Sequence, residues 1–391
     1  MHSVWLAQML AESAGSTKGR KMTSTTRRQY YIAMDITDRC NLRCAMCVRT
    51  ASPKAPGPDL TVEQFRTIGD HCFDHAVVLA LSCVSEPLLS KHFSEIMATL
   101  KDYRVPSVEL VTNGMLLDGP KIAAMLDSRL SRIIFSIDGA TAATYESIRE
   151  GANFERLLSN LQLLQRMKAE RSLSRPLVRF NFVMMRRNIE ELPGLIRLAV
   201  ELGASQVTAQ HMTIYEGAGS EGESLFAYQD LTNRMLLEAH RLAARHRITF
   251  HAPPLFSAGT RSAAESRWLI QSHLVTGMGV IRDFGTARLF SLSRNLLRRK
   301  LAHRRVWCHH PWEIVFLDPQ ANVRPCVNWG TEPVLGNCLE QRLDEILDGP
   351  AYTQLREELS GRASKRGVCL HCPAVASGKV DEATAFEERP G

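Results

Sequence analysis

From about residue 30 onward, short apolar runs alternate with amphipathic stretches. The apolar runs have the length of buried strands, and the stretches between them repeat apolar residues at helical spacing. Helices are predicted near 62–74, 91–102, 119–128, 141–169 and 189–203. Strands are predicted at 31–36, 76–82, 107–112, 132–137, 177–183 and 206–211. This alternation indicates parallel βαβ units in an α/β barrel or doubly wound sheet, where ligands bind at the carboxyl ends of the strands.

The pattern weakens after residue 211 and divides the chain. A helix is predicted near 226–246, a β-hairpin that turns at 318–322, and a further helix near 343–358. The predicted parts are a flexible N-terminal arm (1–29), an α/β core (30–215), a helical connecting region on the substrate side (216–305), a small cysteine-bearing domain (306–376) and a flexible tail (377–391).

Composition narrows the class of protein. The 391 residues are 45% hydrophobic and 23% charged, which excludes a wholly disordered chain, a fibre or a coiled coil. No apolar run is long enough for a transmembrane helix, and the short apolar segment near the N-terminus lacks the basic residues of a signal peptide. A cytoplasmic protein is therefore expected.

Ten cysteines change this picture, because clustered thiols in a cytoplasmic chain of this size indicate metal ligands rather than disulfides. Cys40, Cys44 and Cys47 have the spacing C-x3-C-x2-C and follow the first predicted strand. Three thiolates held close together can bind a 4Fe–4S cluster and leave one iron open to a substrate or cofactor. Zinc is the alternative, because a distant fourth ligand could close a tetrahedral site.

Further polar motifs stand at the ends of the later strands. The second strand is followed by Ser82-Cys83-Val84-Ser85-Glu86-Pro87, the third ends in Thr112-Asn113-Gly114, and the fourth in Ser136-Ile137-Asp138-Gly139. With the cysteines, these motifs make residues 30–215 resemble the radical S-adenosylmethionine (SAM) superfamily. The resemblance implies a partial (β/α)6 barrel, similar to a TIM barrel. It also implies a SAM site formed by Ser85, Glu86, Thr112, Asn113, Ser136, Asp138, Arg149 and Asn181.

The resemblance assigns roles to these residues. Glu86 would meet the SAM amino group, and Arg149 would face the SAM carboxylate. The reduced cluster would cleave SAM to a 5′-deoxyadenosyl radical that abstracts hydrogen from a substrate carbon. The chain departs from the family in Cys83 and Ser85, which replace the two glycines of Gly-x-Gly-Glu-Pro, and in Met46, where an aromatic residue is frequent.

A second group of cysteines lies near the C-terminus. Cys308 and Cys326 flank the predicted hairpin, and Cys369 and Cys372 form a C-x2-C pair beyond the last predicted helix. Four thiolates fit zinc or a 4Fe–4S cluster, and the spacing leaves both open. The stretch 308–373 resembles the SPASM/twitch extension of radical SAM enzymes. Because no cysteine follows Cys372, the shorter twitch form is the better match, which implies that these four cysteines bind one auxiliary 4Fe–4S cluster.

The expected activity is that of a radical SAM oxidoreductase. If the auxiliary cluster accepts an electron, the net reaction is an oxidation (dehydrogenation); if a thiol such as Cys338 returns a hydrogen atom, the result is epimerisation. Cys338 could equally be a core residue or a spare ligand, and Cys72 is predicted to be a core thiol. A small sugar- or cyclitol-like substrate is predicted. The alternatives are modification of a ribosomally made peptide and, more remotely, a non-catalytic zinc-binding interaction protein.

The expected partners follow from charge and chemistry. Reduced flavodoxin or a ferredoxin-type protein would supply electrons. The formal charge is +7, and a basic stretch lies at 294–305. Such stretches are usually solvated helix faces, but this one could also contact an acidic electron carrier, an anionic substrate or an anionic membrane surface. No nucleic-acid partner is expected, because the chain has no fold signature for one.

Overall fold

The computed structural model describes residues 28–51, 57–213, 221–253, 255–256, 310–326 and 333–361, and the single residues 308, 329, 364 and 369. The basic stretch 294–305, the tail 377–391, most of the predicted arm and most of the predicted connecting region lie outside these residues. Within the described part, no helix is both long and apolar enough to cross a membrane.

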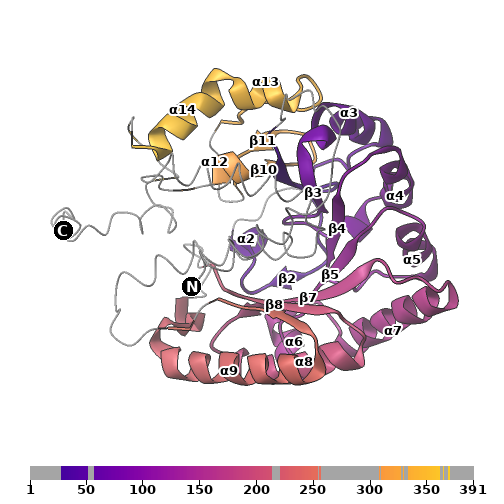
Figure 1. Cartoon of the computed structure of the whole chain (residues 1–391), viewed down its shortest axis with the longest axis vertical. Coiled ribbons are helices and arrows are strands. Elements are labelled where there is room, and N and C mark those ends of the chain that lie inside the picture. The colour runs from indigo at the N-terminus through magenta and orange to yellow at the C-terminus, as the bar shows by residue number, and fades with distance from the viewer. Residues whose placement is uncertain are drawn as a thin grey trace, which may run out of the picture.

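The described strands form one curved sheet with the order β11-β10-β1-β3-β4-β5-β7-β8-β9 (Figure 1). Every neighbouring pair is parallel except β10 with β11. The six predicted strands are confirmed to within two residues at each end, and within the described residues the sheet does not close on itself. The strands are β1 (Tyr30–Met34), β3 (Ala76–Leu81), β4 (Ser107–Thr112), β5 (Arg132–Ser136), β7 (Leu177–Met184), β8 (Gln206–His211), β9 (Thr249–His251), β10 (Ile314–Leu317) and β11 (Val323–Arg324).

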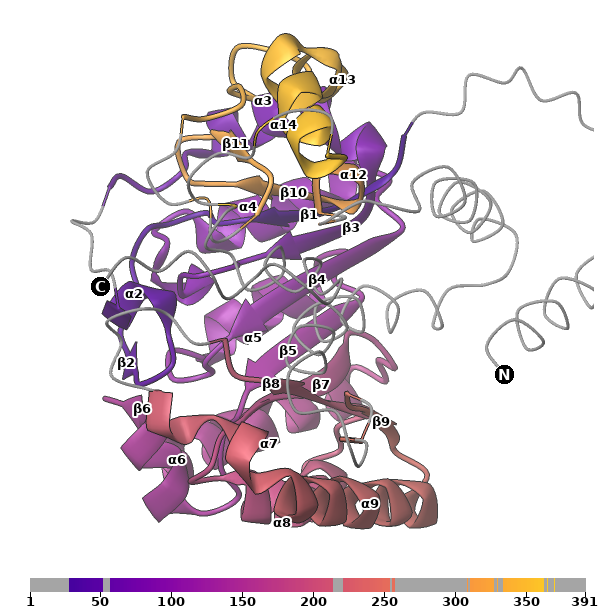
Figure 2. The ribbon, with the colours of Figure 1, turned by 90° about the vertical axis from the view of Figure 1, so that its left-hand side faces the viewer.

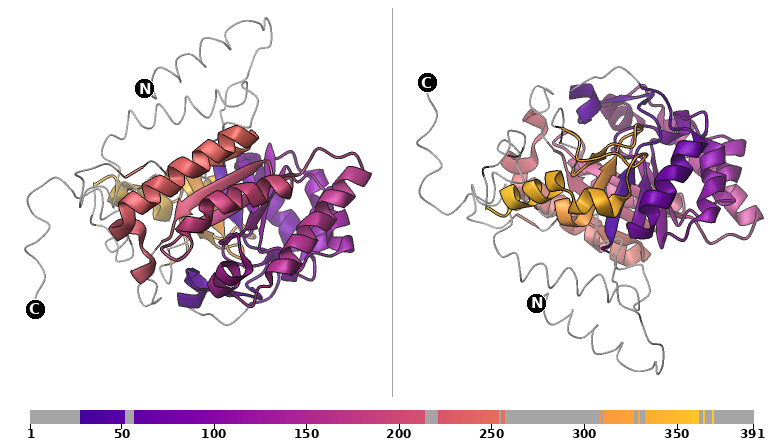
Figure 3. Two further views of the ribbon diagram at one scale, coloured as in Figure 1. Left: turned by 90° about the horizontal axis from the view of Figure 1, so that it is seen from below. Right: turned by 90° about the horizontal axis from the view of Figure 1, so that it is seen from above.

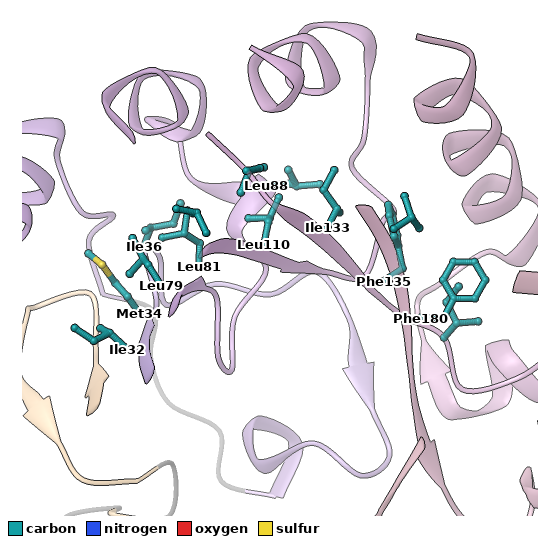
Figure 4. Close-up of a cluster of buried hydrophobic side chains, with 14 of the residues drawn as sticks. Ile32, Met34, Ile36, Leu79, Leu81, Leu88, Leu110, Ile133, Phe135 and Phe180 are labelled. Atoms are coloured by element: carbon teal, nitrogen blue, oxygen red, sulfur yellow. The ribbon is translucent and has the colours of Figure 1, made fainter. Parts of the chain in front are cut away.

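Helices cover the outer, convex face of this sheet (Figure 1). They are α3 (Val62–Cys72), α4 (Phe93–Thr99), α5 (Gly119–Leu126), α6 (Ala142–Ile148), α7 (Phe154–Glu170), α8 (Leu192–Glu201) and α9 (Gln229–His246). The hydrophobic core lies between the two layers, where Ile32, Met34, Leu79, Leu110 and Ile133 are all fully buried (Figure 4). Because side chains alternate along a strand, their neighbours in sequence point into the curve of the sheet.

The predicted helix 141–169 is wrong, because it is broken into α6 and α7. Between them the short strand β6 (Arg149–Glu150) pairs with β2 (Arg43–Cys44), so this backbone cannot continue the helical hydrogen bonds. Gly151 follows with φ +90°, a conformation that favours glycine. The predicted helix near 343–358 is likewise two helices, α13 (Leu343–Asp348) and α14 (Pro350–Leu359), because Gly349 has extended backbone and Pro350 begins the second.

The C-terminal hairpin joins the main sheet. Strand β10 lies parallel to β1, with Tyr31 opposite Ile314, and β11 returns antiparallel as predicted. The turn places Ala321 at φ +62°, where the sequence lacks the usual glycine. Helices α12 (His310–Glu313), α13 and α14 pack above this edge, beside the N-terminal half of the chain (Figures 2 and 3). The hairpin flanked by Cys308 and Cys326 therefore lies beside β1, the strand that precedes the first cysteine group.

Candidate active site

The first three cysteines lie in the loop after β1, at the carboxyl edge of the sheet. Cys44 is buried in β2, whereas Cys40 and Cys47 are partly exposed. The pairing of β2 with β6 fixes this loop, and the Ala45 N–H donates to the Ile148 carbonyl at 2.9 Å. Helix α2 (Val48–Ala51) begins directly after Cys47. Backbone contacts thus bring the three predicted ligands together.

The three predicted ligands interact electrostatically. Burial raises the pKa of Cys44 to about 11, and Cys47 and Cys40 add to the rise while Arg149 opposes it. Three thiolates can hold a 4Fe–4S cluster and leave one iron open, whereas a zinc ion would need a fourth ligand.

Glu86 lies in a buried pocket beside this loop and is only 1% exposed. Its carboxylate accepts hydrogen bonds from Thr112 Oγ1 at 2.7 Å, the Asn113 N–H at 2.7 Å and the Leu88 N–H at 3.2 Å. Burial raises the pKa of Glu86 to about 7, although these donors hold it down. The Asn113 amide also donates to Asn41 Oδ1 at 2.9 Å, which ties the pocket to the cysteine loop. The structure therefore brings Glu86, Thr112 and Asn113 together.

Asp35 shapes the loop that carries Glu86, and the sequence analysis did not select it. Its carboxylate accepts from the N–H groups of Cys83, Val84 and Ser85 at 2.8, 3.2 and 3.3 Å, and from Ser85 Oγ at 2.6 Å. The predicted SAM ligand Ser85 thus directs its hydroxyl at Asp35. Neither Cys83 nor Ser85 has a positive φ, so the side chains that replace the two glycines suit the backbone; the residue of this loop with a positive φ, +80°, is Ser82. An acidic residue directly after a buried strand was the one available signal for Asp35.

Asp138 and Arg149 form a buried ion pair next to the cysteine loop. Arg149 Nη2 lies 2.6 Å from Asp138 Oδ2, and Arg149 Nη1 lies 3.6 Å from Cys44 Sγ. Burial alone would lower the pKa of the Arg149 guanidinium, but Asp138 and Cys44 raise it, so it stays charged. Ser136 and Asn181 face each other across β5 and β7, and both are partly exposed on the inner face of the sheet.

The C-terminal cysteines flank the hairpin of β10 and β11: Cys308 precedes it and Cys326 follows it. Cys308, Cys326 and Cys369 are partly buried, and Cys372 lies outside the described residues. Burial raises the pKa of Cys83, and Asp35, Cys326 and Cys47 raise it further. The Cys83 thiol therefore interacts with one ligand of each predicted cluster.

Cys338 is fully buried in the hydrophobic core. It lies within hydrogen-bonding distance of Cys72 in α3, and its carbonyl is 2.9 Å from His71 Nδ1. Cys72 is the core thiol that its helical position predicted. A hydrogen-atom donor must reach the substrate, and the buried position of Cys338 does not support that role. The role stays a prediction.

Comparison with known proteins identifies two families of domain. Residues 34–199 match the model of the radical SAM superfamily, and residues 308–373 match that of the SPASM iron–sulfur cluster-binding domain. An AdoMet-dependent heme synthase from Methanosarcina barkeri is 30% identical over 94% of this chain and 97% of its own length.

Other curated relatives match only in part. A probable GTP 3′,8-cyclase from Methanocaldococcus jannaschii is 29% identical over 44% of this chain and 56% of its own length. A PqqA peptide cyclase from Bradyrhizobium diazoefficiens is 24% identical over 58% of this chain and 59% of its own length. The chain thus spans little more than half the length of these two relatives.

Solved structures share the fold at low sequence identity. Streptococcus suis SuiB bound to S-adenosylmethionine superposes with a TM-score of 0.61 at 12% identity, over 89% of this chain and 71% of that one. The protein anSMEcpe with bound AdoMet gives 0.58 at 14% identity, over 87% and 86%. The expected cofactors, 4Fe–4S clusters and SAM, are those that the two matched domains bind. This chain belongs to the radical SAM superfamily and carries a C-terminal SPASM iron–sulfur cluster-binding domain.

Proposed function

We propose that this protein is a cytoplasmic radical SAM enzyme that oxidises a precursor of the heme class. The observation that carries the proposal is the match to the AdoMet-dependent heme synthase, which extends over 97% of that relative and therefore includes both cysteine-bearing parts. A formal charge of +7 suits a substrate that carries carboxylate groups, as heme-class tetrapyrroles do.

The described residues suit the first step of such a reaction. A bound 4Fe–4S cluster supplies the electron that cleaves SAM to methionine and a 5′-deoxyadenosyl radical. Cys40, Cys44 and Cys47 would hold that cluster, and the buried Glu86 carboxylate would accept hydrogen bonds from the SAM amino group. Because Glu86 is already fixed by three donors, it needs no rearrangement to bind.

An oxidative outcome needs an acceptor for one electron. When a side-chain carbon loses a hydrogen atom to the deoxyadenosyl radical and then an electron, the remaining cation must lose a proton or CO2 from the neighbouring carbon. The substrate is then oxidised by two electrons in total and gains a C=C bond. Cys308, Cys326, Cys369 and Cys372 would hold the accepting cluster. Support comes from the pairing of β10 with β1 and from the interaction of Cys83 with both Cys47 and Cys326. Reduced flavodoxin or a ferredoxin-type protein would return electrons to the SAM-binding cluster.

Modification of a peptide is the second candidate, because a PqqA peptide cyclase is among the relatives. None of the relatives considered above is named for a sugar or cyclitol substrate, so the small sugar-like substrate expected from the sequence stays a prediction without further support. The heme class takes precedence over the peptide class because the peptide cyclase matches only 59% of its own length.

The test is deuterium transfer from substrate to SAM. Cluster-loaded enzyme is incubated anaerobically with SAM, a reductant and an iron porphyrin whose propionate side chains are deuterated. We expect deuterium in 5′-deoxyadenosine and a porphyrin product that has lost hydrogen, both detected by mass spectrometry. A Cys44→Ala variant controls for background cleavage. If 5′-deoxyadenosine forms without deuterium in every porphyrin tested, the heme-class proposal is wrong, and deuterated peptides are tested next.

A further inference from the structure

Arg149 is held at both ends of its guanidinium group. It is 7% exposed, and its two terminal nitrogens go to different partners, one to Asp138 Oδ2 at 2.6 Å and the other to Cys44 Sγ at 3.6 Å. Asp138 is itself fixed, because its other carboxylate oxygen accepts the Val183 N–H at 2.7 Å and its carbonyl accepts from Asn188 Nδ2 at 3.0 Å. The planar guanidinium is thus oriented before any ligand binds.

The backbone also commits Arg149 to the cysteine loop. Cys44 and Arg149 are direct partners in the pairing of β2 with β6, and the Ala152 N–H donates to the Arg149 carbonyl at 2.9 Å. Since a residue in a paired strand cannot turn its side chain to the opposite face without breaking the pairing, the guanidinium stays beside Cys44. The resemblance had assigned this side chain to the SAM carboxylate instead.

We propose that Arg149 is a positioning residue for the cluster and not a ligand of SAM: its guanidinium donates to the Cys44 thiolate and raises the reduction potential of the SAM-binding cluster. The reduced cluster carries one more negative charge than the oxidised cluster. A positively charged donor at a ligand sulfur therefore stabilises the reduced form more strongly. Hydrogen bonds to ligand sulfurs and burial are the means by which proteins set such potentials. The low exposure of Arg149 and Cys44 keeps water from screening the interaction.

The inference does not depend on the substrate. It can therefore fail while the proposed function holds, and the proposed function can fail while the inference holds. The functional consequence of a raised reduction potential is that an electron donor of modest reducing power could reduce the cluster.

The experiment is a redox titration of the cluster-loaded enzyme, followed by electron paramagnetic resonance. The signal that changes when SAM is added belongs to the SAM-binding cluster, which separates it from the auxiliary cluster. For Arg149→Gln we expect the reduction equilibrium to shift about tenfold toward the oxidised form, which is about 59 mV for one electron. Equilibrium dialysis with SAM should give a Kd within about threefold of wild type.

The matched control is Arg43→Gln, since Arg43 is adjacent to Cys44 in β2 but is exposed. It removes the same charge at the surface, where water screens it, and should shift the equilibrium less than about twofold. Arg149→Lys keeps the charge, yet one ammonium cannot span both partners, so its potential should lie between those of wild type and Arg149→Gln. If Arg149→Gln fails to bind iron, the reduction potential of Arg149→Lys alone tests the inference.

Two results would overturn the inference. One is an unchanged potential in Arg149→Gln or, where only the lysine variant binds iron, a wild-type potential in Arg149→Lys. The other is a Kd for SAM that rises tenfold or more, which would assign Arg149 to the SAM carboxylate whatever the potential does.

Discussion

Replacing Glu86 with glutamine tests the SAM amino-group site, because the carboxylate is buried among fixed donors. One oxygen accepts from Thr112 Oγ1 and the Leu88 N–H, and the other accepts from the Asn113 N–H. Wherever the glutamine places its NH2 group, that group faces a backbone N–H. One backbone donor therefore loses its acceptor, which should lower the free energy of unfolding by about 1–3 kcal/mol.

The same change should weaken SAM binding more strongly than it weakens the fold. A hydrogen bond to a charged group contributes about 1.5–3 kcal/mol. At about 1.4 kcal/mol for each tenfold change, the Kd for SAM should rise roughly ten- to hundredfold.

Affinity should also depend on pH through Glu86. Burial raises the pKa of this carboxyl to about 7 from the unfolded value of 4.5, so the folded protein favours its protonated form. Its contribution to stability is therefore fully present below pH 4.5 and is lost as the pH rises through 7. SAM binding has the opposite sign because the ionised form is the better acceptor. Between pH 6 and pH 7.5 the ionised fraction rises about eightfold, which is the upper limit for the gain in affinity.

Equilibrium dialysis of the cluster-loaded enzyme with SAM at both pH values measures these effects. Glu95→Gln is the matched control, because the Glu95 side chain is 67% exposed and should leave the Kd unchanged. The reasoning is refuted if Glu86→Gln changes the Kd less than threefold, or if it keeps the pH dependence of the wild type. Subtracting the glutamine variant removes any pH dependence that arises from the cluster or from SAM itself.

Three further predictions concern the loop, the core and the metal content. Asp35→Ala removes the oxygen, Oδ1, that accepts from three N–H groups and a hydroxyl, so it should weaken SAM binding about tenfold, while an unchanged Kd would remove Asp35 from the site. Cys338→Ala should lower the free energy of unfolding by about 1–2 kcal/mol in a denaturant titration and leave the rate of product formation within twofold; loss of a deuterium label from solvent in the product would instead reinstate Cys338 as a hydrogen donor. Anaerobically purified protein should contain about eight irons per chain, and about four irons with one zinc would contradict an accepting cluster at Cys308, Cys326 and Cys369.

Local sequence accounts for the strands and for the edge on which the chemistry lies. Apolar runs of strand length are buried wherever they occur, so β4 and β8 have the predicted bounds. Parallel strands bring their carboxyl ends to one edge, which is why Thr112 and Asn113 could be placed near Glu86 without coordinates. The spacing of Cys40, Cys44 and Cys47 also identified a cluster loop, because ligands that are close in sequence are close in space.

The sequence did not reveal where the helix predicted at 141–169 is interrupted. Apolar spacing on either side of residue 150 is helical, and the signal for a break, Gly151, is a single residue. What ends α6 is the pairing of Arg149 with Cys44, a partner that lies 105 residues away. No local pattern records such a contact.

The sequence by itself determined the family, the alternating architecture, the cysteine loop and Glu86, because each depends on local spacing or on the common direction of parallel strands. Only the tertiary structure decided that β10 lies beside β1, that Asp35 holds the loop before Glu86, and that Arg149 points at Cys44. These features join segments from distant parts of the chain, and their free energy comes from burying polar groups with matched partners. Such a match exists only when the sheet has brought the partners together.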